Sequence, residues 1–194
     1  MKLDGKRVAI LATDGFEQSE LMSPRKALLE AGAKVEVVSP ESDSIKGWSK
    51  GEWAETVKVN KRLEDANPSD YDALVLPGGV INPDKLRNND KAVEFVRSFF
   101  SDGSQRPVAA ICHGPQILIN ADVLDDRELT SWSSIRKDLE NAGASWVDRE
   151  VVVDQGLVTS RSPDDLDAFN DKMIEEIAEG VHHDSHIHEG ASLN

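Results

Sequence analysis

The amino-acid sequence predicts a three-layer α/β sandwich built on a mostly parallel sheet. Short apolar runs typical of buried strands alternate with segments whose apolar residues recur at helical spacing. The helical segments are long enough to serve as crossovers, which favours parallel strands with helices on both faces of the sheet. In such a fold a ligand binds at the carboxyl ends of the strands.

The first half of the chain contains three expected strands, each a buried apolar run that ends in a turn signal. They are residues 7–13 before Asp14-Gly15, residues 34–39 before Pro40, and residues 73–76 before Pro77-Gly78-Gly79. The first helix ends at Gly32 and has Pro24 either in its first turn or at a kink. Residues 54–60 alternate between apolar and polar and predict a small hairpin.

The second half continues the alternation of helix and strand. Helices are expected over residues 92–100, 116–121, 133–142 and 166–177, and strands over residues 107–111, 150–153 and 157–160. We find no internal repeat and no linker, so we expect one domain over residues 1–180. Residues 181–194 lack periodicity and are expected to form a flexible tail that contains histidines.

The balance of charge restricts the partners of the protein. Lys and Arg total 22, Asp and Glu total 36, and the net charge is −14. Such a surface repels nucleic-acid phosphates and anionic lipids, so neither nucleic acid nor a membrane is an expected partner. Because no apolar run is long enough to span a bilayer and the first residues lack the apolar stretch of a secretory signal, we expect a cytoplasmic protein.

The most informative local feature surrounds the single cysteine, Cys112. It directly follows a buried strand, and Gly114 comes two residues later, before a helix. This order is typical of a nucleophile elbow with cysteine in place of serine. The helix N-terminus would then stabilise a thiolate. The alternative is an inert core cysteine.

Two side chains are candidates to act on this thiol. His113 is the one histidine outside residues 181–194, so it is the imidazole that the domain can offer as a base or thiolate partner. Its alternative role is packing behind Cys112. Glu17 follows the first strand and is therefore expected at the same sheet edge, where its carboxyl group would share a proton with the thiol. Its alternative role is that of a glutamate favoured at a helix entry.

Two further features lie after the third strand. Gly78 and Gly79 leave backbone N–H groups open to an anion, as an oxyanion hole requires, although the same residues also suit a simple tight turn. Asp84 is another candidate carboxylate, and its alternative is a surface acid.

These motifs resemble the ThiJ/PfpI family, and in particular its branch of PfpI-type intracellular cysteine peptidases, along about residues 6–180. The resemblance is carried by residues 14–17, 74–79, 110–116 and 157–166. It implies a flavodoxin-like fold related to class I glutamine amidotransferases. It also implies a homodimer, from which some members of the family build larger oligomers.

The resemblance also implies roles for the candidate residues. Cys112 matches the nucleophile, His113 the histidine that follows it, and Glu17 the acid that bonds the thiol and stabilises its sulfinic form. Gly78 and Gly79 match the amides of the oxyanion hole.

Asp84 is the best match to a triad glutamate that reaches in from a neighbouring subunit, and it is one methylene shorter.

The function implied is that of a stress-related cysteine hydrolase that attacks small carbonyl compounds, glycated amines or peptides, with no cofactor. The alternative is a non-catalytic stress or redox-sensing protein whose Cys112 is oxidised to sulfenic or sulfinic acid. A third possible function is metal binding by the four C-terminal histidines, His182, His183, His186 and His188. Their spacing is not that of a closed zinc site, so we expect a solvated segment and no metal.

Overall fold

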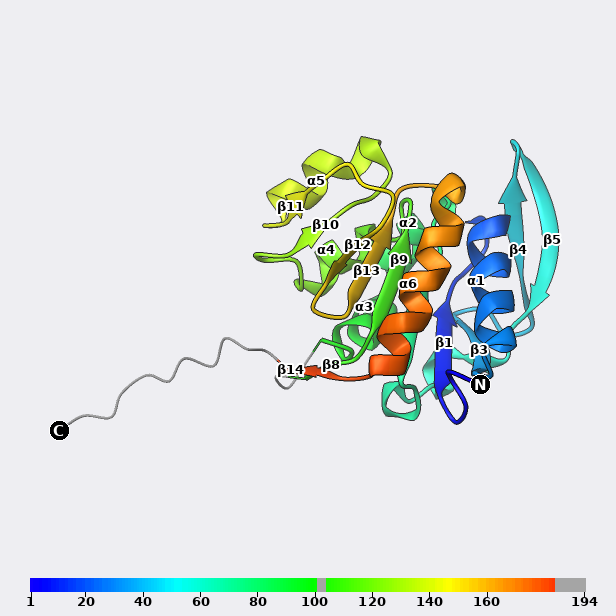
Figure 1. Cartoon of the computed structure of the whole chain (residues 1–194). Coiled ribbons are helices and arrows are strands. Elements are labelled where there is room, and N and C mark those ends of the chain that lie inside the picture. The colour runs from blue at the N-terminus through cyan, green and yellow to red at the C-terminus, as the bar shows by residue number, and fades with distance from the viewer. Residues whose placement is uncertain (101–103, 184–194) are drawn as a thin grey trace.

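The computed structural model describes residues 1–100 and 104–183, and it confirms the predicted three-layer sandwich (Figure 1). The strands of the central sheet are β1 (Arg7–Leu11), β3 (Lys34–Ser39), β6 (Lys61–Arg62), β7 (Ala73–Leu76), β9 (Val108–Ile111), β12 (Val152–Asp154) and β13 (Leu157–Ser160). Their order across the sheet is β12-β13-β9-β7-β1-β3-β6. Neighbouring strands are parallel, except that β12 runs antiparallel to β13.

Helices cover both faces of this sheet. One face carries α1 (Gln18–Glu30) and α6 (Leu166–Glu179), and the other carries α2 (Ile81–Arg87), α3 (Asp90–Arg97), α4 (Gln116–Ala121) and α5 (Arg136–Asn141). Successive side chains of a strand point to opposite faces. In β1, Val8 and Ile10 join the core under α1 and α6, while Ala9 and Leu11 join the other core. Because both faces are buried, the strands read as unbroken apolar runs.

Smaller elements flank the sandwich. Three short sheets are formed by β2 (Phe16–Glu17) with β4 (Ser44–Ser49) and β5 (Glu52–Lys58), by β8 (Ser104–Gln105) with β14 (His182–His183), and by β10 (Glu128–Leu129) with β11 (Ser145–Trp146). Short 3-10 helices span Leu63–Asp65, Pro68–Asp70, Ser133–Ile135 and Pro163–Asp165.

The predicted hairpin over residues 54–60 is wrong in position. The observed hairpin joins β4 to β5 through Lys50 and Gly51, which have φ angles of +51° and +83°. Two successive residues with positive φ form the turn that suits a two-residue hairpin. Lysine is an unusual residue in that conformation, so its presence concealed the turn.

Helix α2 was not predicted at all. It covers residues 81–87, has Pro83 in its first turn, and places Asp84 on an exposed helical face. Its two buried apolar anchors, Pro83 and Leu86, are three residues apart. So short a segment does not display helical periodicity, and its stability comes from packing against the core.

The structure also changes the start of the predicted tail. His182 pairs with Gln105 and His183 pairs with Ser104 in an antiparallel ladder, so these two histidines are part of the folded domain. His186 and His188 lie outside the described residues.

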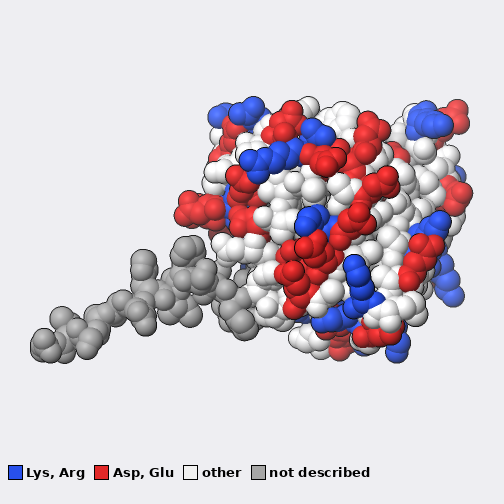
Figure 2. Space-filling view, in the orientation of Figure 1, with Lys and Arg blue, Asp and Glu red and all other residues white. Residues whose placement is uncertain are grey.

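Carboxylates and basic groups are interspersed on the face of the molecule shown in Figure 2, with acidic side chains in the majority. Across residues 1–100 and 104–183, none of the helices combines the length and the apolar character needed to cross a bilayer.

Candidate active site

Cys112 lies at the predicted strand-to-helix turn, immediately after β9. Its φ angle is +62°, a left-handed conformation that costs a non-glycine residue roughly 1 kcal/mol or more. Two backbone hydrogen bonds hold it there: the Cys112 N–H donates to the Ser160 carbonyl at 3.0 Å, and the Trp132 N–H donates to the Cys112 carbonyl at 2.9 Å. Strand β13 and the loop at Trp132 therefore hold the strained backbone that aims the side chain.

The turn also depends on Gly114. Its N–H donates to the Ile111 carbonyl at 2.8 Å. A Cβ at this position would meet the carbonyl oxygens of Leu76 and Ile111, both backbone atoms that have no room to move. The helix that follows, α4, contains only 6 residues. A dipole that short is a weak source of stabilisation for a thiolate.

The carboxyl group that lies against Cys112 belongs to Glu20, whereas the sequence analysis expected Glu17 there. Glu20 is completely buried, and its Oε2 accepts a hydrogen bond of 2.8 Å from the Gly78 N–H. A Cβ on Gly78 would meet both this oxygen and, at 2.8 Å, the Cβ of Cys112. Glu17 instead occupies the N-cap position of α1 without a side-chain capping bond; it is half-buried and accepts a hydrogen bond from the Ser19 hydroxyl at 3.2 Å.

A signal for Glu20 was present in the sequence. Residues 20, 24 and 28 share one stripe of a helix, since residues four apart face the same way. Pro24 and Leu28 are buried on that stripe of α1, and Glu20 is buried with them. A carboxyl group at a core position of a helix is exceptional unless it has a specific partner.

Burial shifts the proton equilibria of both groups. It raises the pKa of Glu20 from 4.5 to about 8, an effect that the neighbouring thiol and the Gly78 and Gly79 amides oppose and the charge of Glu17 reinforces. Burial and then the Glu20 charge raise the pKa of the Cys112 thiol, which the His113 and Gly79 amides partly offset. The site thus favours a proton on the Cys112–Glu20 pair over the free thiolate that the sequence analysis expected.

The Gly78 and Gly79 amides, both expected to bind an oxyanion, have different partners. The Gly78 N–H is occupied by Glu20. The Gly79 N–H acts on the sulfur, as does that of His113. Gly79 has a φ angle of +80°, and a Cβ there would meet the Gly15 carbonyl oxygen and, at 2.8 Å, the Glu17 nitrogen. The amides of Gly79 and His113 therefore lie near the sulfur, and the Gly79 amide also acts on Glu20; that these amides bind an oxyanion stays a prediction.

Asn82 was missed by the sequence analysis and holds this loop in place. It is fully buried, and its side-chain amide donates to the carbonyls of Pro77 at 3.0 Å and Gly78 at 3.1 Å. Its own oxygen accepts from the Thr13 N–H at 2.8 Å. One side chain thus ties the loop after β7 to the loop after β1.

His113 lies beside the thiol. Its Nδ1 lies 3.3 Å from the Cys112 sulfur, and its Nε2 lies 3.3 Å from the Ser134 hydroxyl. The ring stacks on Trp132, with 6.0 Å between the ring centroids. Burial lowers the pKa of His113, so the imidazole is neutral near neutral pH and one of its ring nitrogens can accept a proton.

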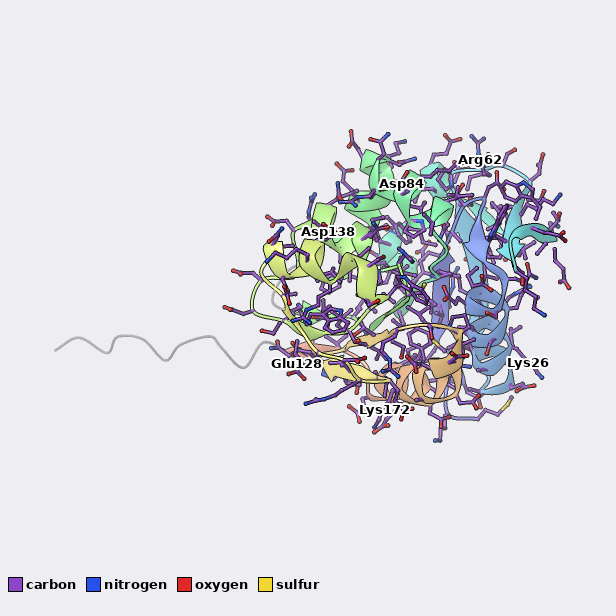
Figure 3. The ribbon with its side chains drawn as sticks, turned by 90° about the horizontal axis from the view of Figure 1, so that it is seen from above. Lys26, Arg62, Asp84, Glu128, Asp138 and Lys172 are labelled. Atoms are coloured by element: carbon purple, nitrogen blue, oxygen red, sulfur yellow. The ribbon has the colours of Figure 1, made fainter. Side chains whose placement is uncertain are left out.

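The structure does not bring Asp84 to this site within one chain. Asp84 is exposed on α2, in the outer helical layer seen in Figure 3. Among the described residues, the polar contact of His113 on the side away from Cys112 is a serine hydroxyl and not a carboxylate.

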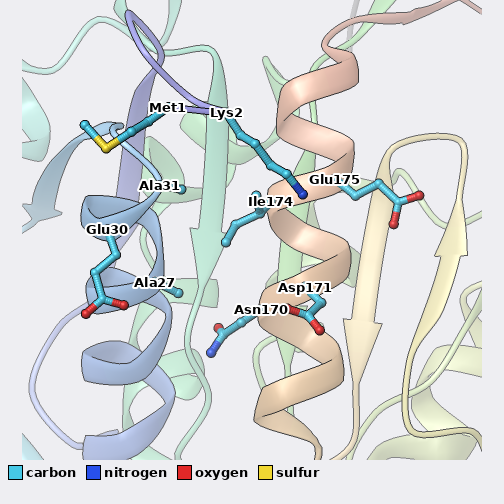
Figure 4. Close-up of a pocket in the computed structure, with 9 residues that line it drawn as sticks. All are labelled: Met1, Lys2, Ala27, Glu30, Ala31, Asn170, Asp171, Ile174 and Glu175. Carbon is cyan, nitrogen blue, oxygen red and sulfur yellow. The ribbon is translucent and has the colours of Figure 1, made fainter.

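A groove of about 750 Å³ lies elsewhere, between α1 and α6 (Figure 4). Its lining includes Met1, Ala27, Asn170 and Ile174. None of the candidate site residues lines it, so it is separate from the site around Cys112.

The fold and the site together define a class of flavodoxin-like α/β proteins that carry a cysteine where a central strand turns into a helix. Within that class, the chain belongs to the DJ-1/PfpI family, which it matches over residues 6–176.

Individual relatives agree with this assignment. The chain is 51% identical to general stress protein 18 of Bacillus subtilis over 172 residues, which cover 88% of this chain and 96% of the relative. It is 46% identical to protein/nucleic acid deglycase 2 of Escherichia coli over 170 residues, covering 87% and 96%. A solved two-domain protein of Anabaena variabilis, with DJ-1/ThiJ/PfpI-like and ferritin-like domains, has a TM-score of 0.82 and 38% identity. That match covers 89% of this chain and 48% of the other, so this chain spans about half of that protein.

Proposed function

We propose that the protein is a cysteine-dependent hydrolase that acts on 2-oxoaldehydes and on the amines that they have glycated. The observation that carries the proposal is the position of the Cys112 sulfur, 3.3 Å from a histidine nitrogen and against a buried carboxyl group. A relative named as a deglycase supports this chemistry, and another named as a general stress protein supports a role in stress.

In the proposed first step, the sulfur attacks the carbonyl carbon and a C–S bond forms. The thiol proton passes to the neutral His113 ring, whose Nδ1 lies 3.3 Å from the sulfur. The carbonyl oxygen becomes an oxyanion, and the Gly79 and His113 amides stabilise it. Glu20 keeps its proton and avoids a second negative charge beside the adduct. The hydrogen on the former aldehyde carbon then moves to the neighbouring ketone carbon, which oxidises the first carbon to a thioester and reduces the second to an alcohol. Water hydrolyses the C–S bond of the thioester, so the net reaction adds water, gives a 2-hydroxy acid and regenerates the thiol.

Turnover of methylglyoxal by the purified protein tests this proposal. We expect Cys112→Ala to reduce the rate at least about a hundredfold, because the nucleophile is lost. An unfolding curve for the variant confirms that it is folded. Equal turnover by the two proteins would overturn the proposal.

A second candidate is a stress protein that senses peroxide through Cys112. The buried Glu20 supports it, because a protonated carboxyl group can donate a hydrogen bond to a sulfinate oxygen. Mass spectrometry of the intact protein after graded peroxide tests it. Addition of two oxygen atoms at Cys112 supports the sensor, and a thiol that stays unmodified in the folded protein contradicts it.

We further propose that the protein acts as a homodimer in the cytoplasm, with Asp84 of one copy completing the His113 site of the other. Sedimentation analysis measures the oligomeric state. If the proposal holds, Asp84→Asn lowers kcat for methylglyoxal and leaves the dimer intact. A monomer, or an unchanged kcat in the dimeric variant, would contradict it.

A further inference from the structure

A cluster of potential metal ligands lies at the end of α6. It consists of Glu176 and Glu179, three residues apart in the last turns of the helix, and His182 of β14. One ligand atom from each residue lies within 4.8 Å of the others. α6 starts beside the carboxyl end of β13 and runs to the opposite edge of the sheet, where β14 begins (Figure 1). The cluster is therefore remote from Cys112.

Two atoms of this cluster are buried without a hydrogen bond. Glu176 is only 7% exposed. Its Oε2 makes an ion-pair contact of 3.0 Å with the Nε2 of His182, and within the described part of the chain neither atom has a partner in hydrogen-bonding geometry. Burying polar atoms without a partner costs free energy, so most such atoms in proteins are satisfied. A cation coordinated by both atoms would satisfy them together.

The charges around Glu176 also favour a cation. Glu175 and Glu179 place two further carboxylates on the same last turns of α6 as Glu176. Lys172 makes an ion pair of 2.7 Å with Glu175, and the Lys6 ammonium lies near Gly180, just after the helix. Acidic side chains also gather on the face of the molecule on which α6 lies (Figure 2).

The histidine is held in place by its surroundings. The backbone of His182 pairs with Gln105 of β8, which fixes the strand beside the end of α6. The imidazole packs on the β12–β13 turn at Gly156, where φ is +82° and a Cβ would approach the ring Cδ2 to 2.7 Å. A side chain at that turn would displace the ring, so the turn glycine preserves its position.

We propose that Glu176, Glu179 and His182 form a binding site for a divalent transition-metal ion of the Zn²⁺ class. Carboxylate oxygens and imidazole nitrogens coordinate Zn²⁺ at about 2.0–2.2 Å, and two ligands of one ion are then roughly 3–3.5 Å apart. The 3.0 Å between Oε2 and Nε2 suits such a pair. The ligand atoms of all three residues spread over up to 4.8 Å, so the exposed Glu179 side chain moves inward when the ion binds. With three protein ligands, water completes the coordination. The ion joins β14 to α6 and stabilises the domain, which is a role separate from the chemistry proposed for Cys112.

Titration calorimetry with zinc chloride tests the site. The experiment uses the full chain with Cys112→Ala throughout, so that the thiol does not compete for the ion. We expect one zinc ion per chain, and an affinity at least about tenfold weaker in Glu179→Gln and in His182→Gln. Glu179 is exposed, so its substitution leaves the core intact even if a buried variant fails to fold.

A matched control replaces the remaining C-terminal histidines, His183, His186 and His188, with glutamine. The proposal predicts zinc affinity within about twofold of the parent and a zinc-induced rise in Tm that is retained in this control but lost in Glu179→Gln. The proposal is overturned if the parent binds no zinc, if this control abolishes binding, or if Glu179→Gln and His182→Gln bind as tightly as the parent.

Discussion

Replacing Glu20 with glutamine should stabilise the protein, and the gain should grow with pH. Glutamine keeps the shape of the side chain and an oxygen that accepts from the Gly78 N–H. It removes a carboxyl group that is buried beside Cys112 and has to ionise there as the pH rises. The site predicted to be central to function is therefore also a site of instability.

The direction and size of this stability difference follow from the pKa shift of Glu20. The pKa of Glu20 is 4.5 when unperturbed and about 8 in the folded protein. Below pH 4.5 both states hold the proton, and the wild type has its full stability. Between about pH 4.5 and 8 the unfolded chain releases a proton that the folded chain retains, so wild-type stability falls as pH rises. At about 1.4 kcal/mol per pH unit, the loss is roughly 3 kcal/mol at pH 7 and about 5 kcal/mol at pH 8.

Urea unfolding at pH 5, 6, 7 and 8, followed by tryptophan fluorescence, measures this difference. The free energy of unfolding of Glu20→Gln should exceed that of the wild type by an amount that grows by several kcal/mol across the series. Glu30→Gln is the matched control, because Glu30 is exposed on the same helix and its substitution makes the same chemical change at a solvated position. A wild-type and Glu20→Gln difference that stays constant with pH would refute the reasoning.

Two further predictions concern the same site. The alkylation rate of Cys112 should rise with pH through about 8, where the Cys112–Glu20 pair loses its first proton, and Glu20→Gln should lack this rise. The same pH profile in the variant and the wild type would contradict a proton equilibrium shared by Cys112 and Glu20. Gly79→Ala should lower the free energy of unfolding by more than about 2 kcal/mol and abolish turnover, because the new Cβ meets the Gly15 carbonyl oxygen. Gly51 also has a positive φ, but no atom lies within 4 Å of a Cβ built there, so Gly51→Ala should cost only about 1 kcal/mol. Equal losses in the two variants, measured by urea unfolding, would show that backbone strain alone matters.

The sheet could be predicted because its strands are buried on both faces. β3, β7 and β13 have the predicted boundaries, since an apolar run bounded by turn residues leaves little ambiguity. The errors arose where local composition conceals the conformation. Lys50 adopts a positive φ without being glycine, and α2 is too short to show a periodic pattern.

Site residues that are neighbours in the sequence could be predicted, whereas residues that the fold brings together from distant segments could not. Cys112 and His113 are adjacent in the sequence, so the turn after β9 predicts both. Glu20 reaches the thiol through the packing of α1 on the sheet, which depends on contacts between distant segments. Local reasoning therefore selected Glu17, the carboxylate nearest to the strand end.

The same limit applies to the end of α6. The pairing of β14 with β8 brings His182 to Glu176, and the spacing of the four C-terminal histidines carries no information about it.

The central claim is that Cys112 lies against a carboxyl group that holds its proton near neutral pH. The most direct test is a pH titration of the Glu20 side-chain carboxyl carbon by NMR in isotope-labelled protein. The structure predicts a midpoint near 8, set by burial beside the thiol. A midpoint near the ordinary 4.5 would contradict the account, because Glu20 would then be a charged carboxylate throughout the physiological range.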